Sequence, residues 1–123
     1  GAWAVYDIGT PIDERIVAGQ IEGGMVQGLG YGAMEVLDIR DGKPLQCNLT
    51  DYILPTFLDF PSTTYSLIKS KSKIGPYGAR GLGELTMVRT APALAAAIEN
   101  AIGKEVARLP LTPEYLLEVM SND

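Results

Sequence analysis

The hydrophobic pattern near the start of the chain predicts a strand followed by a long helix. Residues 3–8 form a short, mostly apolar and aromatic run that ends at the turn Gly9-Thr10-Pro11. From about Ile16 to Leu37 the apolar positions recur at helical spacing instead. The apolar stripe of this predicted helix contains Ile21, Met25, Leu29, Gly32 and Val36.

A hairpin and a long loop are predicted in the middle of the chain. Asp41-Gly42 is a strong hairpin signal between residues 36–40 and 44–47. Two prolines and a polar run then mark a long ordered loop over residues 55–64.

The second half begins with a predicted strand over residues 65–74 and a tight loop over residues 75–83. The loop holds four glycines and one proline in nine positions, which predicts positive-φ conformations. After the loop, Thr90 is expected to cap a helix over residues 91–101, which Gly103 ends.

The end of the chain predicts a short strand at residues 106–109 and a last helix that starts at Thr112-Pro113-Glu114. There is no internal repeat and no flexible linker, so the pattern indicates an α+β fold. We therefore expect a single compact unit that combines a glycine-rich helix, a hairpin, mixed strands and an alanine-rich helix.

Composition and charge limit the chemistry open to this chain. Its 123 residues suit one domain, and 15 acidic against 10 basic residues give a net charge of −5, which does not favour nucleic-acid binding. No apolar run approaches the roughly 20 residues that cross a bilayer, and the single cysteine, Cys47, suits a reducing cytoplasm. The absence of histidine excludes Ser-His-Asp and Cys-His catalysis and the usual zinc sites. Chemistry must come from carboxylates, lysine, tyrosine, backbone amides or an external cofactor.

The predicted first helix carries an unusual number of glycines. Each interior glycine costs roughly 1 kcal/mol relative to alanine, so we expect close approach of another backbone or of a ligand. Gln20 and Gln27 share the glycine-lined face and could hydrogen-bond a polar planar ligand. The alternative is two glutamines that face solvent. The glycines are Gly19, Gly23, Gly24, Gly28, Gly30 and Gly32.

The loop that ends at Glu84 is a further candidate site. Its glycines could present backbone N–H groups to an anion, with the Glu84 carboxylate as an adjacent base. The spacing of Gly78, Gly81 and Gly83 fits neither a Walker loop nor a dinucleotide fingerprint. From spacing alone, a structural turn is the favoured interpretation.

Two other polar groups have structural interpretations that we favour over functional ones. Lys69, Lys71 and Lys73 alternate along the predicted strand, a pattern typical of a protected edge strand, with anion binding as the alternative. Asp51, Tyr52 and Asp59 could form a carboxylate constellation, but we expect them to order the loop that contains them.

Six groups of motifs, in this order, resemble one family. They are Asp7-Ile8-Gly9; Gly19-Gln20-Ile21-Glu22-Gly23-Gly24 with Gln27-Gly28-Leu29-Gly30 and Glu35; Asp51-Tyr52-Ile53-Leu54-Pro55-Thr56 with Asp59-Phe60-Pro61; Gly75-Pro76-Tyr77-Gly78-Ala79-Arg80-Gly81-Leu82-Gly83-Glu84; Ala91-Pro92-Ala93; and Leu109-Pro110-Leu111-Thr112-Pro113-Glu114. Together they cover nearly the whole chain. Residues 1–123 are similar to the C-terminal part of the molybdopterin-binding domain of molybdenum hydroxylases, the xanthine dehydrogenase and aldehyde oxidase family.

The resemblance implies a cofactor and a catalytic residue. The dithiolene of molybdopterin would hold the metal, so the protein need not supply ligands to it. Glu84 would be the general base that removes a proton from a molybdenum-bound hydroxyl, and the oxygen, derived from water, would attack an electron-poor carbon of a purine, N-heterocycle or aldehyde. The cofactor-binding residues that the resemblance implies are Gln20, Gly23, Gly24, Arg80, Gly81, Leu82 and Gly83.

The resemblance also implies partners. Much of the cofactor and substrate pocket would lie in the rest of the molybdenum subunit, and iron–sulfur and FAD centres on other domains or subunits. Alone, the chain is expected to be inactive, and it is expected to bind neither nucleic acid nor a membrane. The alternative is a non-catalytic module of the same fold that docks to a partner subunit.

Overall fold

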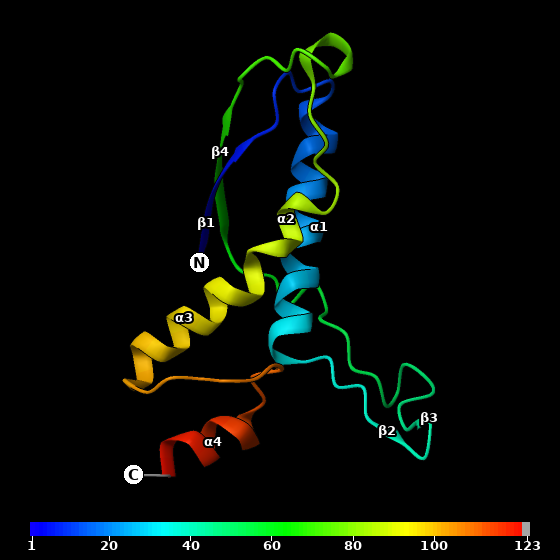
Figure 1. Ribbon diagram of the computed structural model, residues 1–123, viewed down its shortest axis with the longest axis vertical. Helices are drawn as coiled ribbons and strands as arrows, with labels where there is room; N and C mark the ends of the chain where they lie inside the picture. The colour runs from blue at the N-terminus through cyan, green and yellow to red at the C-terminus, as the bar shows by residue number, and fades with distance from the viewer. Residues whose placement is uncertain (122–123) are drawn as a thin grey trace.

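The computed structural model describes residues 1–121 as two strand pairs and a set of helices (Figure 1). The strands are β1 (Ala2–Asp7), β2 (Ile39–Arg40), β3 (Lys43–Pro44) and β4 (Thr63–Ile68). The α-helices are α1 (Glu14–Ala33), α2 (Leu85–Val88), α3 (Thr90–Ile102) and α4 (Pro113–Ser121), and η1 (Pro76–Gly78) is a 3-10 turn. These elements confirm the predicted α+β class.

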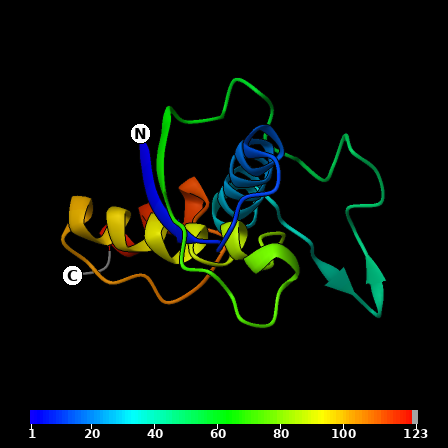
Figure 2. The same ribbon diagram turned by 90° about the horizontal axis from the view of Figure 1, so that it is seen from above.

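The long helix α1 is the centre of the arrangement. Strands β1 and β4 lie on one side of it, and the β2–β3 hairpin lies on the other (Figures 1 and 2). β1 and β4 are parallel neighbours, with Ala2 opposite Thr63 and Asp7 opposite Ile68. The two strands therefore end at the same level, and the chain segments that follow them emerge side by side.

The main core forms where β1 packs on α1. Tyr6 and Ile8 from the first strand region meet Val17, Ile21 and Met25 of the helix, and Ile21 is fully buried. On the helix these apolar residues recur every four positions, which is the spacing that predicted the helix. α1 begins after Asp13, whose carboxylate accepts a hydrogen bond from the N–H of Arg15 and caps the helix.

Glycines on the same buried side of α1 admit further helices. A Cβ added to Gly24 would overlap with the side chain of Thr86 in α2, and one added to Gly28 would lie 2.6 Å from Cβ of Thr90. Because real Cβ atoms do not approach so closely, only glycine allows α2 and the start of α3 to pack here. The expected close approach of another backbone is therefore confirmed for these glycines.

Several sequence-based predictions of local structure are confirmed. Asp41 and Gly42 both have left-handed φ, at 51° and 75°, and form the turn of the hairpin, whose strands are shorter than predicted. Gly103 ends α3 in the left-handed conformation, and the Thr112 hydroxyl accepts a hydrogen bond from the N–H of Tyr115 at the start of α4.

The predicted strand over residues 65–74 is wrong in extent. β4 ends at Ile68, opposite the end of β1, because no strand remains for it to pair with. Lys69, Lys71 and Lys73 therefore lie beyond the strand rather than along one of its faces, and Lys69 forms an ion pair with Glu14.

Two other predictions are wrong because other parts of the fold form hydrogen bonds with the groups on which those predictions relied. Thr90 does not cap α3, since α2 directly precedes it and the Thr90 hydroxyl donates to the carbonyl of Thr86. Residues 106–109 are not a strand. The N–H of Val106 bonds to the Glu99 carboxylate and that of Ala107 to the Tyr115 hydroxyl, so side chains satisfy this backbone.

We predict that Gly24→Ala loosens α2. The added methyl group has no space beside Thr86, and overpacking of this kind costs roughly 1–3 kcal/mol. Amide hydrogen exchange at Met87 and Val88 should therefore accelerate. Gly19→Ala is the matched control, because open space surrounds Gly19 and alanine favours a helix interior by roughly 0.5–1 kcal/mol. Equal exchange rates in the two variants would contradict this packing.

Candidate functional site

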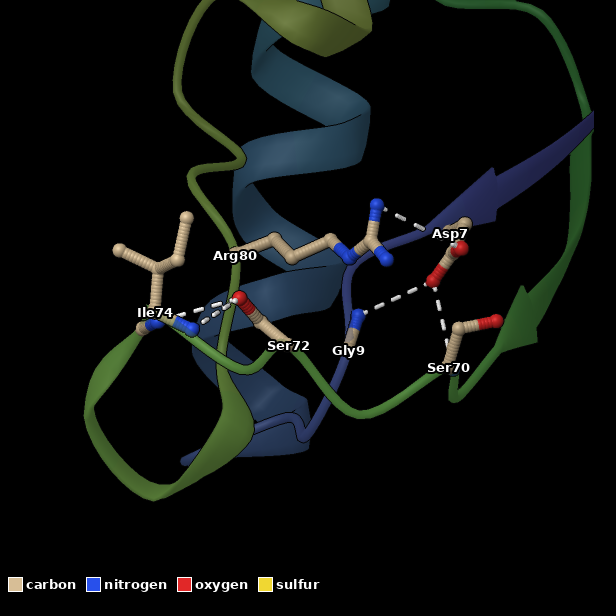
Figure 3. Close-up of polar contacts among 7 residues, drawn as sticks. Asp7, Gly9, Ser70, Ser72, Ile74 and Arg80 are labelled. Carbon is tan, nitrogen blue, oxygen red and sulfur yellow. Dashed lines mark hydrogen bonds and ion pairs between the residues drawn. The ribbon is translucent and has the colours of Figure 1, made fainter.

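Asp7, the last residue of β1, connects three segments of the chain (Figure 3). Its Oδ1 accepts hydrogen bonds from the N–H of Gly9 at 3.2 Å and of Ser70 at 3.3 Å, and its Oδ2 lies 3.8 Å from the guanidinium of Arg80. The hydrogen bond from Gly9 is the main cause that lowers the pKa of Asp7; partial burial opposes it, and Ser70 and Arg80 add to the lowering. One carboxylate thus fixes the ends of both strands relative to the loop that follows β4.

The loop over residues 75–83 is held against the end of β1 by its own backbone. The carbonyl of Gly78 accepts from the N–H groups of Thr10 and Ser72, and the N–H of Arg80 donates to the carbonyl of Ile8. The Ser72 hydroxyl accepts from the N–H of Ile74 and Gly75 (Figure 3). The predicted positive-φ conformation occurs at Gly78, with φ of 82°.

Thr86 fixes the other end of this loop to α1. It is the fully buried polar residue beside Gly24, and its hydroxyl lies 3.1 Å from the carbonyl of Gln20 and 3.3 Å from that of Gly83. A single hydroxyl proton is shared between these two acceptors. Gln20 and Gly83, which are far apart in sequence, are therefore brought together.

The surface beside this contact contains glycines that the contacts of residues 1–121 do not explain. Gly81 and Gly83 lack a left-handed φ, and no atom beyond their chain neighbours lies within 4 Å of a Cβ added to either. Gly23 on α1 is equally open. Conformation and internal packing therefore do not explain these glycines, whereas a group that closely approaches the backbone from outside would.

The predicted cofactor-binding residues do not all face this open surface. Gln20, Gly23, Gly81 and Gly83 are exposed, but Gly24 is buried against Thr86, because α2 packs there. Arg80 and Leu82 line a pocket of about 220 Å³ together with Gln20. Other residues of this pocket come from the turn between β1 and α1, including Thr10, Pro11 and Asp13.

Glu84 is exposed at the junction of the loop and α2. Its carbonyl accepts from the N–H groups of Met87 at 3.1 Å and Val88 at 3.3 Å, so its backbone is fixed by the first turn of the helix. α2 is only four residues long, so the expected helix-dipole contribution at this position is small. Because Glu84 is exposed, its carboxylate is accessible to a group bound against this surface.

The residues predicted to order the middle loop do so. The Tyr52 hydroxyl donates to the Glu35 carboxylate at 2.5 Å, which raises the pKa of Tyr52, and Asp59 accepts from the N–H of Thr56. Asp51 accepts from the side-chain amide of Asn48. These residues lie outside the surface around Glu84 and form no shared carboxylate site.

Residues 1–121 contain no group of three or more histidine, cysteine, aspartate or glutamate side chains arranged to hold a metal ion. Across the same residues, no helix combines the length and apolar character needed to span a membrane.

Sequence reasoning missed the two residues that position the loop, Asp7 and Thr86. Asp7 belongs to a motif that carried the family resemblance, but its contacts with Ser70 and Arg80 join segments more than sixty residues apart. The sequence marks Thr86 only as a polar residue between the loop and the alanine-rich helix, which does not indicate that it is buried.

Comparison with known proteins identifies related sequences. A family model described as a molybdopterin cofactor-binding domain matches residues 1–61. The chain is 37% identical over 112 residues to a probable xanthine dehydrogenase component of Bacillus subtilis, covering 91% of this chain and 15% of that protein. It is 38% identical over 115 residues to the gamma subunit of the 6-hydroxypseudooxynicotine dehydrogenase complex of Paenarthrobacter nicotinovorans, covering 89% and 14%.

Solved structures match the fold over almost the full length of the chain. Quinoline 2-oxidoreductase from Pseudomonas putida 86 superposes with a TM-score of 0.90 at 32% identity, covering 98% of this chain and 16% of that one. Aldehyde oxidoreductase from Desulfovibrio desulfuricans gives 0.85 at 34% identity, covering 94% and 13%.

These matches define the chain as a segment of a molybdopterin-binding domain. The chain belongs to the molybdenum hydroxylase family of xanthine dehydrogenases and aldehyde oxidoreductases, as part of a molybdopterin-binding subunit. It spans only about 15% of the length of the curated relatives it matches.

We predict that Asp7→Asn destabilises the loop in a pH-dependent way. Because the pKa of Asp7 is lowered in the folded state, its charge stabilises the fold above the ordinary aspartate pKa of about 3.9, and this contribution is lost as pH falls through the lower folded value. In the complete subunit, the variant should show faster amide exchange at Arg80 than wild type near pH 7, and the difference should vanish in acid.

Asp41→Asn, in the remote hairpin turn, is the control and should leave exchange at Arg80 unchanged at every pH. A difference between Asp7→Asn and wild type that persists undiminished after Asp7 has been protonated in acid would show that the charge is not what holds the loop.

Proposed function

We propose that this chain, as the C-terminal part of a molybdopterin-binding domain, forms one wall of a molybdenum cofactor site, and that Glu84 is the catalytic base there. The observation that supports this most is the open glycine surface next to Glu84. Gly23, Gly81 and Gly83 leave space for a bulky planar group to approach the backbone, and the exposed amide of Gln20 can donate and accept hydrogen bonds beside it.

The donor set of this surface fits molybdopterin better than a bare metal ion. The described residues offer no ligand cluster, whereas molybdopterin brings its own sulfur ligands. Gln20, Gly23, Gly81 and Gly83 would hold the cofactor on the open surface, and Arg80 and Leu82 would support it from the adjoining pocket. Gly24 would contribute indirectly, by admitting Thr86 and so positioning Gly83.

The chemistry that follows is general-base activation of a nucleophile. When bound, the cofactor supplies the metal and accepts the electrons that leave the substrate. The Glu84 carboxylate removes a proton from the water-derived nucleophile, and an electron-poor carbon of a purine, N-heterocycle or aldehyde is hydroxylated. The hydrogen bonds from the N–H groups of Met87 and Val88 to the Glu84 carbonyl fix the backbone that carries the base.

The activity requires partners beyond this chain. The rest of the molybdenum subunit would complete the cofactor and substrate pocket, and iron–sulfur and flavin centres on other domains or subunits would carry the electrons away. The lone exposed cysteine, Cys47, is compatible with an enzyme of the reducing cytoplasm.

We predict that Glu84→Gln, in the complete molybdenum subunit with its electron-transfer partners, leaves molybdenum content near the wild-type level. Turnover should fall by a factor of roughly 10² to 10⁴, the usual effect of removing a general base. The amide keeps the size of the side chain but cannot accept the proton. Metal analysis and steady-state kinetics on the same preparation separate the two effects.

Glu105→Gln, at an exposed position after α3, is the control and should retain activity. Turnover of Glu84→Gln within a few-fold of wild type would exclude the catalytic role and favour a non-catalytic docking module.

A further inference from the structure

The chain exposes more surface than a self-contained protein of its size. Its accessible surface is 8754 Å², for a mass of 13.2 kDa. A compact monomer of this mass would expose roughly 6,400 Å². The extended hairpin segment contributes to the excess, but large apolar side chains elsewhere are also uncovered, among them Trp3 at 77% and Val5 at 63% exposure.

Trp3 and Val5 belong to a strand with one unoccupied edge. Within residues 1–121, β1 pairs only with β4, in a two-stranded parallel sheet. Sheets of this kind are marginal alone and are normally covered on both faces. The N–H of Ala2 donates to the carbonyl of Ser62, and the N–H of Ile8 donates to the carbonyl of Ile68. Because the direction of the backbone groups alternates along a strand, the N–H groups of the even-numbered residues of β1 point toward β4. The backbone N–H and C=O groups of Trp3 and Val5 therefore point to the free edge.

A groove of about 730 Å³ follows this free edge. Residues from both faces of β1 line it, which places the groove along the edge of the strand rather than over one face. Its other walls are mostly apolar residues of α1 and α3, including Met25, Ala93 and Ala97, and the charged residues Asp59 and Arg89 also border it. Alanines make the α3 wall shallow, so another backbone can come close.

No residue of β1 before Asp7 protects this edge against pairing. Residues 2–6 contain no charged residue and no proline, the features that usually block addition of a strand. An unpaired edge beside an apolar groove has the two parts that strand addition requires: backbone partners for hydrogen bonds and space for apolar side chains.

We propose that an extended apolar strand from the remainder of the molybdenum subunit lies in this groove and pairs with Trp3 and Val5 as the third strand of the sheet. This inference rests on the proposed function, in which the chain is part of such a subunit. The relatives show how much chain a complete subunit has to offer, because about 85% of each lies outside the region that this chain matches. A partner of that size can provide both the strand and the cover for Trp3.

Amide hydrogen exchange in the complete molybdenum subunit tests the pairing, with the strand as its own control. Ala4 and Tyr6 bond toward β4 and should be protected in any case. If the added strand is present, Trp3 and Val5 should be protected to a similar degree, exchanging roughly a hundredfold or more slowly than an open amide. Fast exchange at Trp3 and Val5 beside slow exchange at Ala4 and Tyr6 would overturn the proposal.

A pair of substitutions on α3 tests the groove itself. Ala93→Arg places a long charged side chain in the groove and should reduce the protection of Trp3 and Val5, whereas Ala96→Arg, exposed on the same helix but outside the groove, should not. Equal effects of the two variants would contradict the proposed location.

Two further outcomes are informative. If protection of Trp3 and Val5 in the complete subunit appears only when the subunit dimerises, the occupant is a second copy and the proposal is wrong. Exchange does not depend on turnover, so failure of the Glu84 prediction with protection intact would remove the catalytic role and leave the docking strand in place.

Discussion

The buried contact between Gly24 and Thr86 is the interaction on which the rest of this structure depends. α2 can reach α1 only because Gly24 and Gly28 have no side chains, and the Thr86 hydroxyl then finds its acceptors in the carbonyls of Gln20 and Gly83. A buried hydroxyl without a partner would cost roughly 1–3 kcal/mol. The same contact therefore stabilises the helix packing and fixes the loop that ends at Glu84.

Asp7 provides the second point at which that loop is fixed. It holds the Arg80 end near the termini of β1 and β4, while Thr86 holds the Gly83 end on α1. Between these two anchors, Gly81 faces open space with its backbone uncovered. A rigid loop with an exposed backbone suits close contact with a cofactor, because little conformational entropy is lost when the cofactor binds.

The sequence predicted features that depend on neighbouring residues better than features that depend on tertiary contacts. The hairpin turn at Asp41-Gly42 and the end of α3 at Gly103 follow from local backbone preference, and both were predicted. The end of β4 at Ile68 and the bond of the Thr90 hydroxyl to Thr86 depend on where β1 ends and where α2 packs. At the candidate site, glycine spacing alone favoured a structural turn, and the role of Glu84 came from the family resemblance.

We propose that molybdenum is held at the open surface beside Glu84. Anomalous scattering at the molybdenum edge, from crystals of the complete subunit, measures this directly. We expect an anomalous peak on the surface formed by Gln20, Gly81 and Gly83, with Glu84 as the nearest carboxylate of this chain. A peak in the groove between β1 and α3, or one nearer to Asp7 or Asp13 than to Glu84, would contradict it.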